Sequence, residues 1–263
     1  MTILDKIVER KREEVAEAKA KVSSEELKSY PLFQRECYNL RESILHPERS
    51  GIIAEYKRAS PSKGLINGRD SVQEVVKGYQ EAGASAISVL TDKDFFQGDL
   101  KDLTEAREVL QIPLLRKEFI VDEYQITEAK AYGADIILLI AACLSKEEIQ
   151  SLSSYAKSLG LSVLLEVHNE EELNKSLFDT IDAIGVNNRN LKDFVVSLDH
   201  SYDLVNKIPN QYIKVSESGI SDPQTINELK KAGFQAFLIG ENFMKTENPM
   251  LAILEFTDKV NKD

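Results

Sequence analysis

The chain of 263 residues carries 44 acidic and 33 basic side chains, which gives a net charge of −11 at pH 7. No long basic run is present, so the charge balance argues against nonspecific binding to nucleic acid, and no nucleic-acid partner is expected. A chain of this length buries roughly 70–75% of the surface that its unfolded form exposes, so one large core needs neither metals nor disulfides.

The cysteines and the apolar segments argue against two further classes of protein. Cys37 and Cys143 lie far apart and lack the spacing of a zinc site or of a disulfide framework, which favours a reducing compartment. The first residues form a charged amphipathic pattern instead of a signal peptide, and no run approaches the length of about 18 apolar residues that a membrane span needs. We therefore expect a cytoplasmic protein that has no membrane partner.

Eight short runs of apolar and β-branched residues, bounded by Gly, Pro or Asp, follow one another after residue 50. Each run is too short for a buried helix and too apolar for a loop, so each predicts a strand. The predicted strands are 51–57, 85–91, 112–119, 134–141, 161–167, 183–188, 212–218 and 236–240.

Segments with the spacing of amphipathic helices lie between these strands. Several begin with a capping residue, as at Ser145 with Glu148 three residues later, and several end on Gly. Strand ends recur at intervals of roughly 20–35 residues, the size of a βαβ unit. This alternation predicts an α/β protein with the (β/α)₈ TIM-barrel architecture. A doubly wound open sheet is the alternative, but it needs a glycine-rich first turn, which this sequence lacks.

We expect residues 1–263 to form a single barrel domain, of which about 1–48 is an N-terminal helical extension. The helices of this extension precede the first strand. They could cap the floor of the barrel or partly cover its mouth, and the sequence leaves both arrangements open.

Functional groups of such barrels lie at the C-terminal ends of the strands, where alternate residues share a face. A single charge at a strand end usually stays exposed, but here polar groups follow apolar or small residues at the same parity on five strands. Lys214, which has the parity of Ser216, argues against this pattern unless it reaches solvent at the barrel floor. The residues expected to share the inward face are Ile53, Glu55 and Lys57; Leu115, Lys117 and Phe119; Leu164, Glu166 and His168; Gly185, Asn187 and Arg189; and Ser216 and Ser218.

The predicted mouth therefore combines acidic and basic side chains. Closely packed Lys and Glu side chains shift each other's pKa values, so that one group donates a proton while another accepts it, which suits acid–base chemistry on a carbonyl compound. Arg58 has the opposite parity, and we expect Arg58 and Lys63 to be solvated charges. The polar residues expected at the mouth are Glu55, Lys57, Lys117, Glu166, Asn187 and Arg189.

Gly219 and Gly240 follow the last two predicted strands. Because glycine has no Cβ, the neighbouring backbone N–H groups can approach an anion closely, and the last two loops of these barrels commonly bind phosphate. Turn glycines without a ligand are the alternative. His168 and His200 have no partner at metal-ligand spacing, and Ser218 lacks the leading Gly of a nucleophile elbow, so neither a metal site nor a catalytic triad is expected.

The same segments resemble the signature blocks of the indole-3-glycerol-phosphate synthases of tryptophan biosynthesis. The resemblance runs in order from about residue 50 to about residue 245 through "IIAEYKRASPSKG", "LLRKEFIVDEYQITEAKAYGADIILLIAA", "LLEVHNEEEL", "IGVNNRNL", "VSESGI" and "FLIGENFM". It implies a carboxy-lyase that converts 1-(2-carboxyphenylamino)-1-deoxyribulose 5-phosphate to indole-3-glycerol phosphate, with loss of CO₂ and water and without a metal or an organic cofactor. The implied partner is this phosphorylated small molecule, and we expect a monomer.

The resemblance also implies roles for single residues. Lys117 would protonate the substrate ketone as the ring closes, and Glu166 would assist the later proton removal and dehydration. Lys57 would hold the substrate carboxylate, and the division of proton transfer between the two lysines stays open. Glu55 would orient a lysine. The remaining implied contacts are Asn187 and Ser218 to substrate hydroxyls or the anilino nitrogen, Arg189 near the carboxylate, Phe95 and Phe119 around the aromatic ring, and Ser60, Gly219, Gly240 and the backbone N–H of Glu241 to the phosphate.

Two rival functions stay open on the residues alone. Another phosphate-binding barrel, such as a sugar-phosphate isomerase or phosphoribosylanthranilate isomerase, would share the phosphate cup but would not require Glu55, Lys57, Lys117 and Glu166 together. A noncatalytic barrel that senses a phosphorylated metabolite would bind it without turnover.

Overall fold

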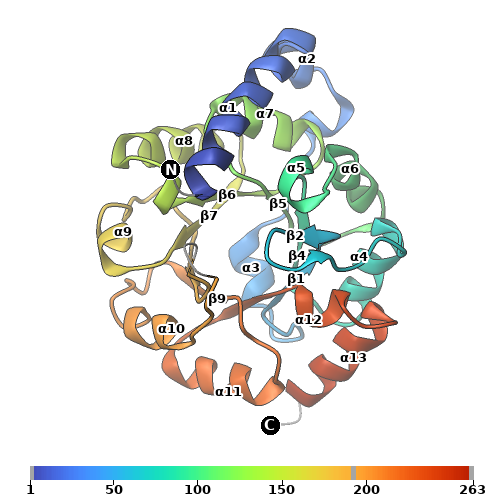
Figure 1. Ribbon diagram of the computed structural model, residues 1–263, viewed down its shortest axis with the longest axis vertical. Coiled ribbons are helices and arrows are strands. Elements are labelled where there is room, and N and C mark those ends of the chain that lie inside the picture. The colour runs from blue at the N-terminus through green and yellow to red at the C-terminus, as the bar shows by residue number, and fades with distance from the viewer. Residues whose placement is uncertain (1–2, 191–193, 261–263) are drawn as a thin grey trace.

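The computed structural model describes residues 3–190 and 194–260. Within these ranges, eight parallel strands close into a barrel with helices around it (Figure 1), which confirms the predicted architecture. The strands follow the order β1-β10-β9-β8-β7-β6-β5-β4, and β4 pairs with β1 to close the ring. Each strand lies inside its predicted range. The bounds are β1 (Ile52–Tyr56), β4 (Ala86–Leu90), β5 (Leu114–Lys117), β6 (Ile136–Ile140), β7 (Ser162–Val167), β8 (Ala183–Asn187), β9 (Ile213–Glu217) and β10 (Ala236–Ile239).

The outer layer consists of helices that cross from one strand to the next. The predicted cap of the helix after β6 is present, because the Ser145 N–H donates to Glu148 Oε2 at 2.7 Å and the Glu148 N–H donates to Ser145 Oγ at 3.2 Å. The helices of this layer are α4 (Val72–Glu81), α5 (Lys93–Phe96), α6 (Leu100–Val109), α7 (Glu123–Ala131), α8 (Lys146–Ser158), α9 (Glu170–Asn174), α10 (Asp199–Leu204), α11 (Pro223–Ala232), α12 (Glu241–Met244) and α13 (Pro249–Val260). A short 3₁₀ helix, η2 (Ala141–Cys143), follows β6, and a small hairpin of β2 (Ala59–Ser60) and β3 (Gly64–Leu65) follows β1.

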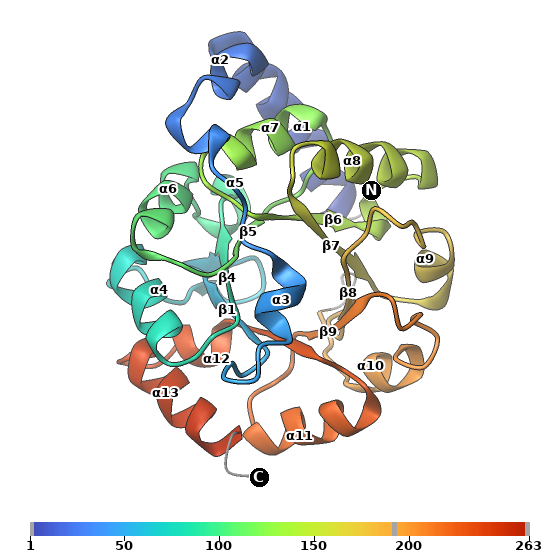
Figure 2. The same cartoon turned by 180° about the vertical axis from the view of Figure 1, so that it is seen from behind.

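The segment before β1 reaches both ends of the barrel, which answers the question that the sequence left open. It contains α1 (Ile3–Lys21), α2 (Ser24–Lys28), the 3₁₀ helix η1 (Pro31–Gln34) and α3 (Leu40–Ile44). Leu40 and Ile44 of α3 pack into the barrel interior, and Figure 2 shows α3 across the end opposite to α1. The start of α1 lies at the mouth, where Ile7 lines the cavity described below. No helix in the described ranges is long and apolar enough to cross a membrane.

Alternation along the strands divides the apolar residues into two layers. One layer fills the barrel interior, and the other lies between strands and helices, as in other barrels of this kind. On β9, Ile213 and Val215 face the interior, so the inward parity leads to Glu217. The prediction that Ser216 faces inward was wrong, since its Oγ lies 2.8 Å from Ser201 Oγ of α10.

Lys214 shares the outward parity. Its Nζ donates to the Val205 carbonyl at 2.9 Å, so Lys214 is buried beneath the helices and does not reach solvent at the floor.

Candidate active site

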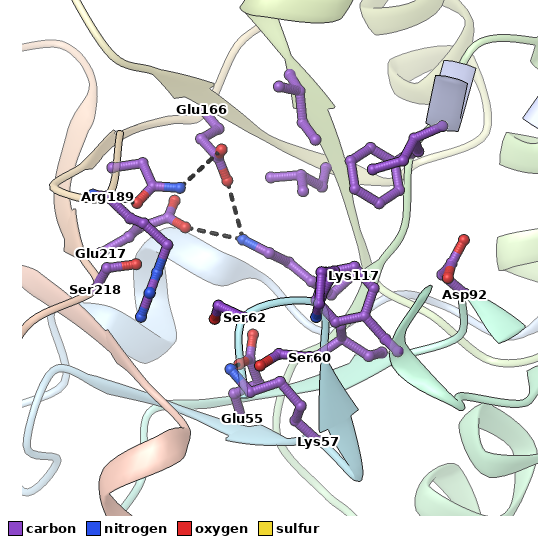
Figure 3. A pocket seen from close by; sticks show the side chains of 18 of the residues that line it. Glu55, Lys57, Ser60, Ser62, Asp92, Lys117, Glu166, Arg189, Glu217 and Ser218 are labelled. Atoms are coloured by element: carbon purple, nitrogen blue, oxygen red, sulfur yellow. Dashed lines mark hydrogen bonds and ion pairs between the residues drawn. The ribbon is translucent and has the colours of Figure 1, made fainter. Parts of the chain in front are cut away.

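A cavity of about 170 Å³ opens at the C-terminal end of the barrel. Its polar wall comes from the last inward-facing residues of the strands, because parallel strands bring their C-terminal ends to one rim. Figure 3 shows these side chains converging from different strands. The predicted residues that line this cavity are Glu55, Lys57, Ser60, Lys117, Phe119, Glu166, Asn187, Arg189, Ser218 and Glu241.

Lys117 is the centre of the polar wall. Its Nζ lies 3.1 Å from Glu166 Oε2 and 2.9 Å from Glu217 Oε2 (Figure 3). Burial alone would lower the pKa of this ammonium, but the charges of Glu217 and Glu166 outweigh burial and raise it. Lys117 is therefore held as a protonated donor between two carboxyl groups.

The two carboxyl groups beside Lys117 have different surroundings. Glu166 Oε1 accepts a hydrogen bond from Asn187 Nδ2 at 3.0 Å, whereas Glu217 Oε1 is buried and has no hydrogen-bond partner among the described residues. Burial raises the pKa of Glu217 to about 7, and the neighbouring Glu166 charge acts in the same direction. Burial also opposes ionisation of Glu166, but Lys117, His168 and Asn187 together bring its pKa below the usual value. At neutral pH, Glu217 is therefore the carboxyl that more readily holds a proton.

Gly185 of β8 makes room for the carboxyl group of Glu217. A Cβ at Gly185 would lie 2.0 Å from Glu217 Oε1 and 3.0 Å from its Cδ. The absence of a side chain at Gly185 therefore lets the Glu217 carboxyl group pack against β8, whereas a side chain on this inner face would displace it from Lys117.

Glu55 and Lys57 form a second ion pair at the mouth, with Lys57 Nζ 2.7 Å from Glu55 Oε1. A Cβ at Gly240 would lie 2.6 Å from the same carboxylate oxygen, so the glycine after β10 leaves space for Glu55. Arg58 is on the other face, as predicted, but it is not a solvated charge. It forms a bidentate pair with Asp102 of α6 and stacks over Tyr56, with its guanidinium carbon 5.2 Å from the ring centroid.

The opposite wall of the cavity is apolar. Phe96 and Phe119 stand with ring centroids 6.1 Å apart, and Ile3, Leu4 and Ile7 of α1 extend this wall. Phe95 was expected here, but among the described residues its neighbour Phe96 lines the cavity and Phe95 does not. The reason is local, because α5 is a single short turn in which successive side chains point in different directions.

A second cavity of about 630 Å³ adjoins the first and is lined by Gly219 and Gly240. Ser218 and Gly219 have φ values of 68° and 80°, and successive residues with this kind of turn geometry can form a concave group of backbone N–H donors. Ser60 Oγ, at the edge of the first cavity, is buried and has no hydrogen-bond partner within residues 3–190 and 194–260. These features suit an anion such as phosphate.

The Glu241 carboxylate faces basic side chains of the mouth. Its oxygens lie 3.7 Å from Arg189 Nη2 and 4.0 Å from Lys63 Nζ. The carboxylate therefore points toward the mouth, where it would repel a bound phosphate, so only the backbone N–H of Glu241 suits the expected phosphate contact.

Helix α1 is fastened to this end of the barrel by a buried lysine. Lys11 Nζ lies 2.8 Å from Asp92, 3.0 Å from Glu118 and 2.7 Å from Glu14. Asp92 lies two residues after β4 and Glu118 directly follows β5, so Lys11 joins α1 to the two loops that carry the aromatic wall. Across the described residues, no group of three or more His, Cys, Asp or Glu side chains is arranged to hold a metal ion.

A sequence model described as "Indole-3-glycerol phosphate synthase" matches residues 4–256 of the chain. The chain belongs to the indole-3-glycerol phosphate synthase family. Members of this family are decarboxylating lyases of tryptophan biosynthesis that act on a phosphorylated small molecule.

Curated relatives of the same name match almost the whole chain. The indole-3-glycerol phosphate synthase of Bacteroides thetaiotaomicron is 47% identical over 247 residues, which cover 94% of this chain and 94% of that protein. The corresponding protein of Polaromonas sp. is 44% identical over 257 residues, which cover 96% of this chain and 97% of that protein.

Solved structures with little sequence similarity share the fold. "Crystal structure of KGPDC from Streptococcus mutans" superposes with a TM-score of 0.59 at 10% identity, covering 80% of this chain and 97% of that one. "Native KDPGal structure" gives a TM-score of 0.57 at 13% identity, covering 80% of this chain and 92% of that one. Because sequence identity with both structures is so low, their similarity to this chain shows only a shared fold.

The sequence analysis did not name Glu217 as a site residue, although this glutamate lines the cavity. The sequence did contain the pattern that points to Glu217. On this strand the apolar residues Ile213 and Val215 are followed at the same parity by a polar residue at the strand end, as on the other strands. The positive φ of Ser218 breaks the alternation, so both Glu217 and Ser218 line the cavity although they are adjacent.

Proposed function

We propose that the chain converts 1-(2-carboxyphenylamino)-1-deoxyribulose 5-phosphate to indole-3-glycerol phosphate, with Lys117 as the general acid and Glu166 as the acid–base group of the later steps. The observation that carries these roles is the partly buried Lys117 ammonium between two carboxyl groups, at the junction of an aromatic wall and the cavity lined by Gly219 and Gly240. Such a cavity can hold the aryl end and the phosphate end of one substrate and so bring the reacting carbons together.

In the first step, the aromatic carbon that bears the carboxylate attacks the substrate ketone. The ketone oxygen gains negative charge as the new bond forms, and Lys117 stabilises that charge and gives the oxygen a proton. Loss of CO₂ then returns the bonding electrons to the ring. Lys57, paired with Glu55 at 2.7 Å, supplies the positive charge that holds the carboxylate before it leaves.

In the last step, a neighbouring carbon loses a proton, and the new hydroxyl group gains a proton and leaves as water, so the group that takes the first proton can return it to the leaving oxygen. Glu166 is suited to take this proton because it stays ionised beside Lys117 and Asn187. Asn187 and Ser218 position the substrate hydroxyls or the anilino nitrogen, and Arg189 adds positive charge. Phosphate is bound by Ser60, the backbone beside Gly219 and Gly240, and the Glu241 N–H, while Phe119 and Phe96 enclose the aromatic ring.

Turnover of the carboxyphenylamino-deoxyribulose phosphate, followed by indole fluorescence, tests this proposal. We expect Lys117→Ala and Glu166→Gln each to lower kcat by at least about 10²-fold without loss of the fold, the usual scale for a lost acid–base group. Lys101→Ala, which removes an exposed lysine of α6, is the matched control and should leave kcat unchanged. Absence of product at high enzyme concentration would refute the function, and near-normal turnover by either variant would refute that residue's role.

We further propose that the enzyme is a cytoplasmic monomer formed by one barrel domain with its N-terminal helical extension. The two free cysteines, Cys37 and Cys143, support a reducing compartment. Light scattering of the purified protein tests the oligomeric state, and a mass of twice the chain mass would contradict the monomer.

A further inference from the structure

His168 lies next to Glu166 but does not line the cavity. It is the first residue after β7, and its Nε2 lies 3.5 Å from Glu166 Oε1. This nitrogen is buried and has no hydrogen-bond partner in the described part of the chain. A buried N–H group without a hydrogen-bond partner lowers the stability of the fold. The position of this nitrogen next to an active-site carboxylate therefore needs an explanation.

The other ring nitrogen of His168 faces a second carboxylate. Nδ1 lies 3.3 Å from Glu172 Oε2, and the same oxygen accepts the His168 backbone N–H at 2.8 Å. Glu172 is fixed in turn at the start of α9, where Asn169 Nδ2 donates to Glu172 Oε1 at 2.8 Å. The imidazole is therefore set between one carboxylate that belongs to the helix cap and one that belongs to the cavity.

Two flanking carboxylates favour the imidazolium form, in which both ring nitrogens carry a proton and both can donate. Burial opposes this charge, but Glu172 and Glu166 outweigh burial and raise the pKa of His168. The imidazolium places a second positive charge beside Glu166, on a different side from Lys117. Glu217, by contrast, shares the Lys117 ammonium with Glu166.

We propose that His168, oriented by Glu172, is a positioning residue that keeps Glu166 ionised and correctly placed, and so decides which of the two glutamates beside Lys117 holds a proton. His168 does not touch the substrate and acts through Glu166. The inference rests on the role of Glu166 in the proposed function.

The ionisable groups that face this pair within the described residues enter the expected pH dependence. Glu166 faces Lys117 of β5, Glu217 of β9, His168 after β7 and the Cys143 thiol of η2. His168 faces Glu166, Glu172 of α9 and, at longer range, Glu217 of β9. Burial raises the pKa of the Cys143 thiol to about 12, so this group stays neutral over the range of the assay.

The first test is the pH profile of kcat for His168→Gln and His168→Leu, measured once the wild-type protein has been shown to turn over the carboxyphenylamino-deoxyribulose phosphate. Leu removes both the donor and the charge, so the pKa of Glu166 should rise and the acid limb should move up by about one pH unit. Gln keeps an N–H donor and should give a smaller shift. KM should change less than twofold, because His168 does not line the cavity.

Glu172→Gln should move the acid limb in the same direction, since the imidazolium loses its other counter-ion. His46→Gln changes an exposed histidine before β1 and is the matched control. A purely structural role for His168 would lower kcat by the same factor at every pH. Unchanged acid limbs in the folded His168→Gln and Glu172→Gln proteins would therefore overturn the proposal, even if His168→Leu failed to fold.

The second test needs no turnover and so stays independent of the proposed function. Imidazole NMR signals of the three histidines are followed against pH, and His168 is assigned by its loss in His168→Gln. We expect His168 to titrate above the usual range of an imidazole, and Glu166→Gln to lower its midpoint, because coupling between two groups is reciprocal. An unchanged His168 midpoint in Glu166→Gln would overturn the proposal.

Discussion

Replacement of Gly185 by Ala tests whether the gap on β8 places Glu217 beside Lys117. Gly185 lies in a strand and outside the left-handed region, so its backbone accepts alanine and only the space around it is at issue. The new Cβ would lie 2.0 Å from Glu217 Oε1, and ordinary contact begins at 3.4 Å, so the carboxyl group must withdraw by about 1.4 Å.

Such a withdrawal breaks the 2.9 Å contact between Lys117 and Glu217. Forcing a methyl group into a filled core costs about 1–3 kcal/mol, so the free energy of unfolding should fall by that amount. A displacement on the scale of about 1 Å in an active site lowers activity by about 10²-fold, so kcat should fall on this scale. Urea denaturation and steady-state kinetics of Gly185→Ala measure the two effects.

A double-mutant cycle isolates the contact. In a Glu217→Ala background the obstacle is absent, so adding Gly185→Ala should change the free energy of unfolding by less than about 0.5 kcal/mol. Gly68→Ala is a control, since its Cβ would meet nothing closer than a Leu65 side-chain carbon at 3.4 Å. If Gly185→Ala were equally destabilising with and without Glu217, the role assigned to the glycine would be refuted.

Three further predictions concern single charges. Lys11→Met should lower the free energy of unfolding by about 3–5 kcal/mol, because it removes the ion-pair partner of the buried Asp92 carboxylate. It should also raise KM, since Ile7 of the same helix lines the cavity. Thermal unfolding and kinetics check both effects, and an unchanged KM would contradict the second. Burial raises the pKa of Glu217 from 4.5 to about 7, so the stability that its proton confers is complete below pH 4.5 and is lost as the pH rises through 7. Glu217→Gln should remove this loss in urea denaturation at pH 5 and pH 8, and an equal loss in both proteins would count against the raised pKa. Glu241→Ser removes a carboxylate that faces Arg189 and should lower KM for the phosphorylated substrate about two- to fivefold, the scale of an exposed charge pair; a higher KM would contradict this.

The barrel could be predicted because its strands are short, apolar and separated by helical segments of similar length. Local sequence is sufficient for such elements, and the order in which parallel strands close follows from chain connectivity. Strand parity also brought Glu55, Lys117 and Glu166 to one cavity, because a regular strand keeps its alternation to the last residue.

The sequence was a poorer guide wherever the backbone leaves the regular strand. Ser218 has a positive φ, which turns it into the cavity beside Glu217 and hides the true parity of β9. The choice between Phe95 and Phe96 depends on the rotation of a single helical turn. His168 shares the parity of Glu166, which predicted an inward position, but β7 ends at Val167 and the His168 side chain does not line the cavity.

The fastening of α1 has a consequence for the order in which the chain folds. Lys11 and Asp92 are separated by 81 positions in the sequence, and Glu118 follows later still. Helix α1 leaves the ribosome before β4 and β5, yet its lysine has no site to enter until these strands have formed and brought both carboxylates together. Contacts between such distant positions form late, because closing the intervening loop has an entropic cost. This part of the mouth is therefore completed by a helix that is synthesised before the strands it joins, and α1 must remain undocked until the first three barrel strands have been made.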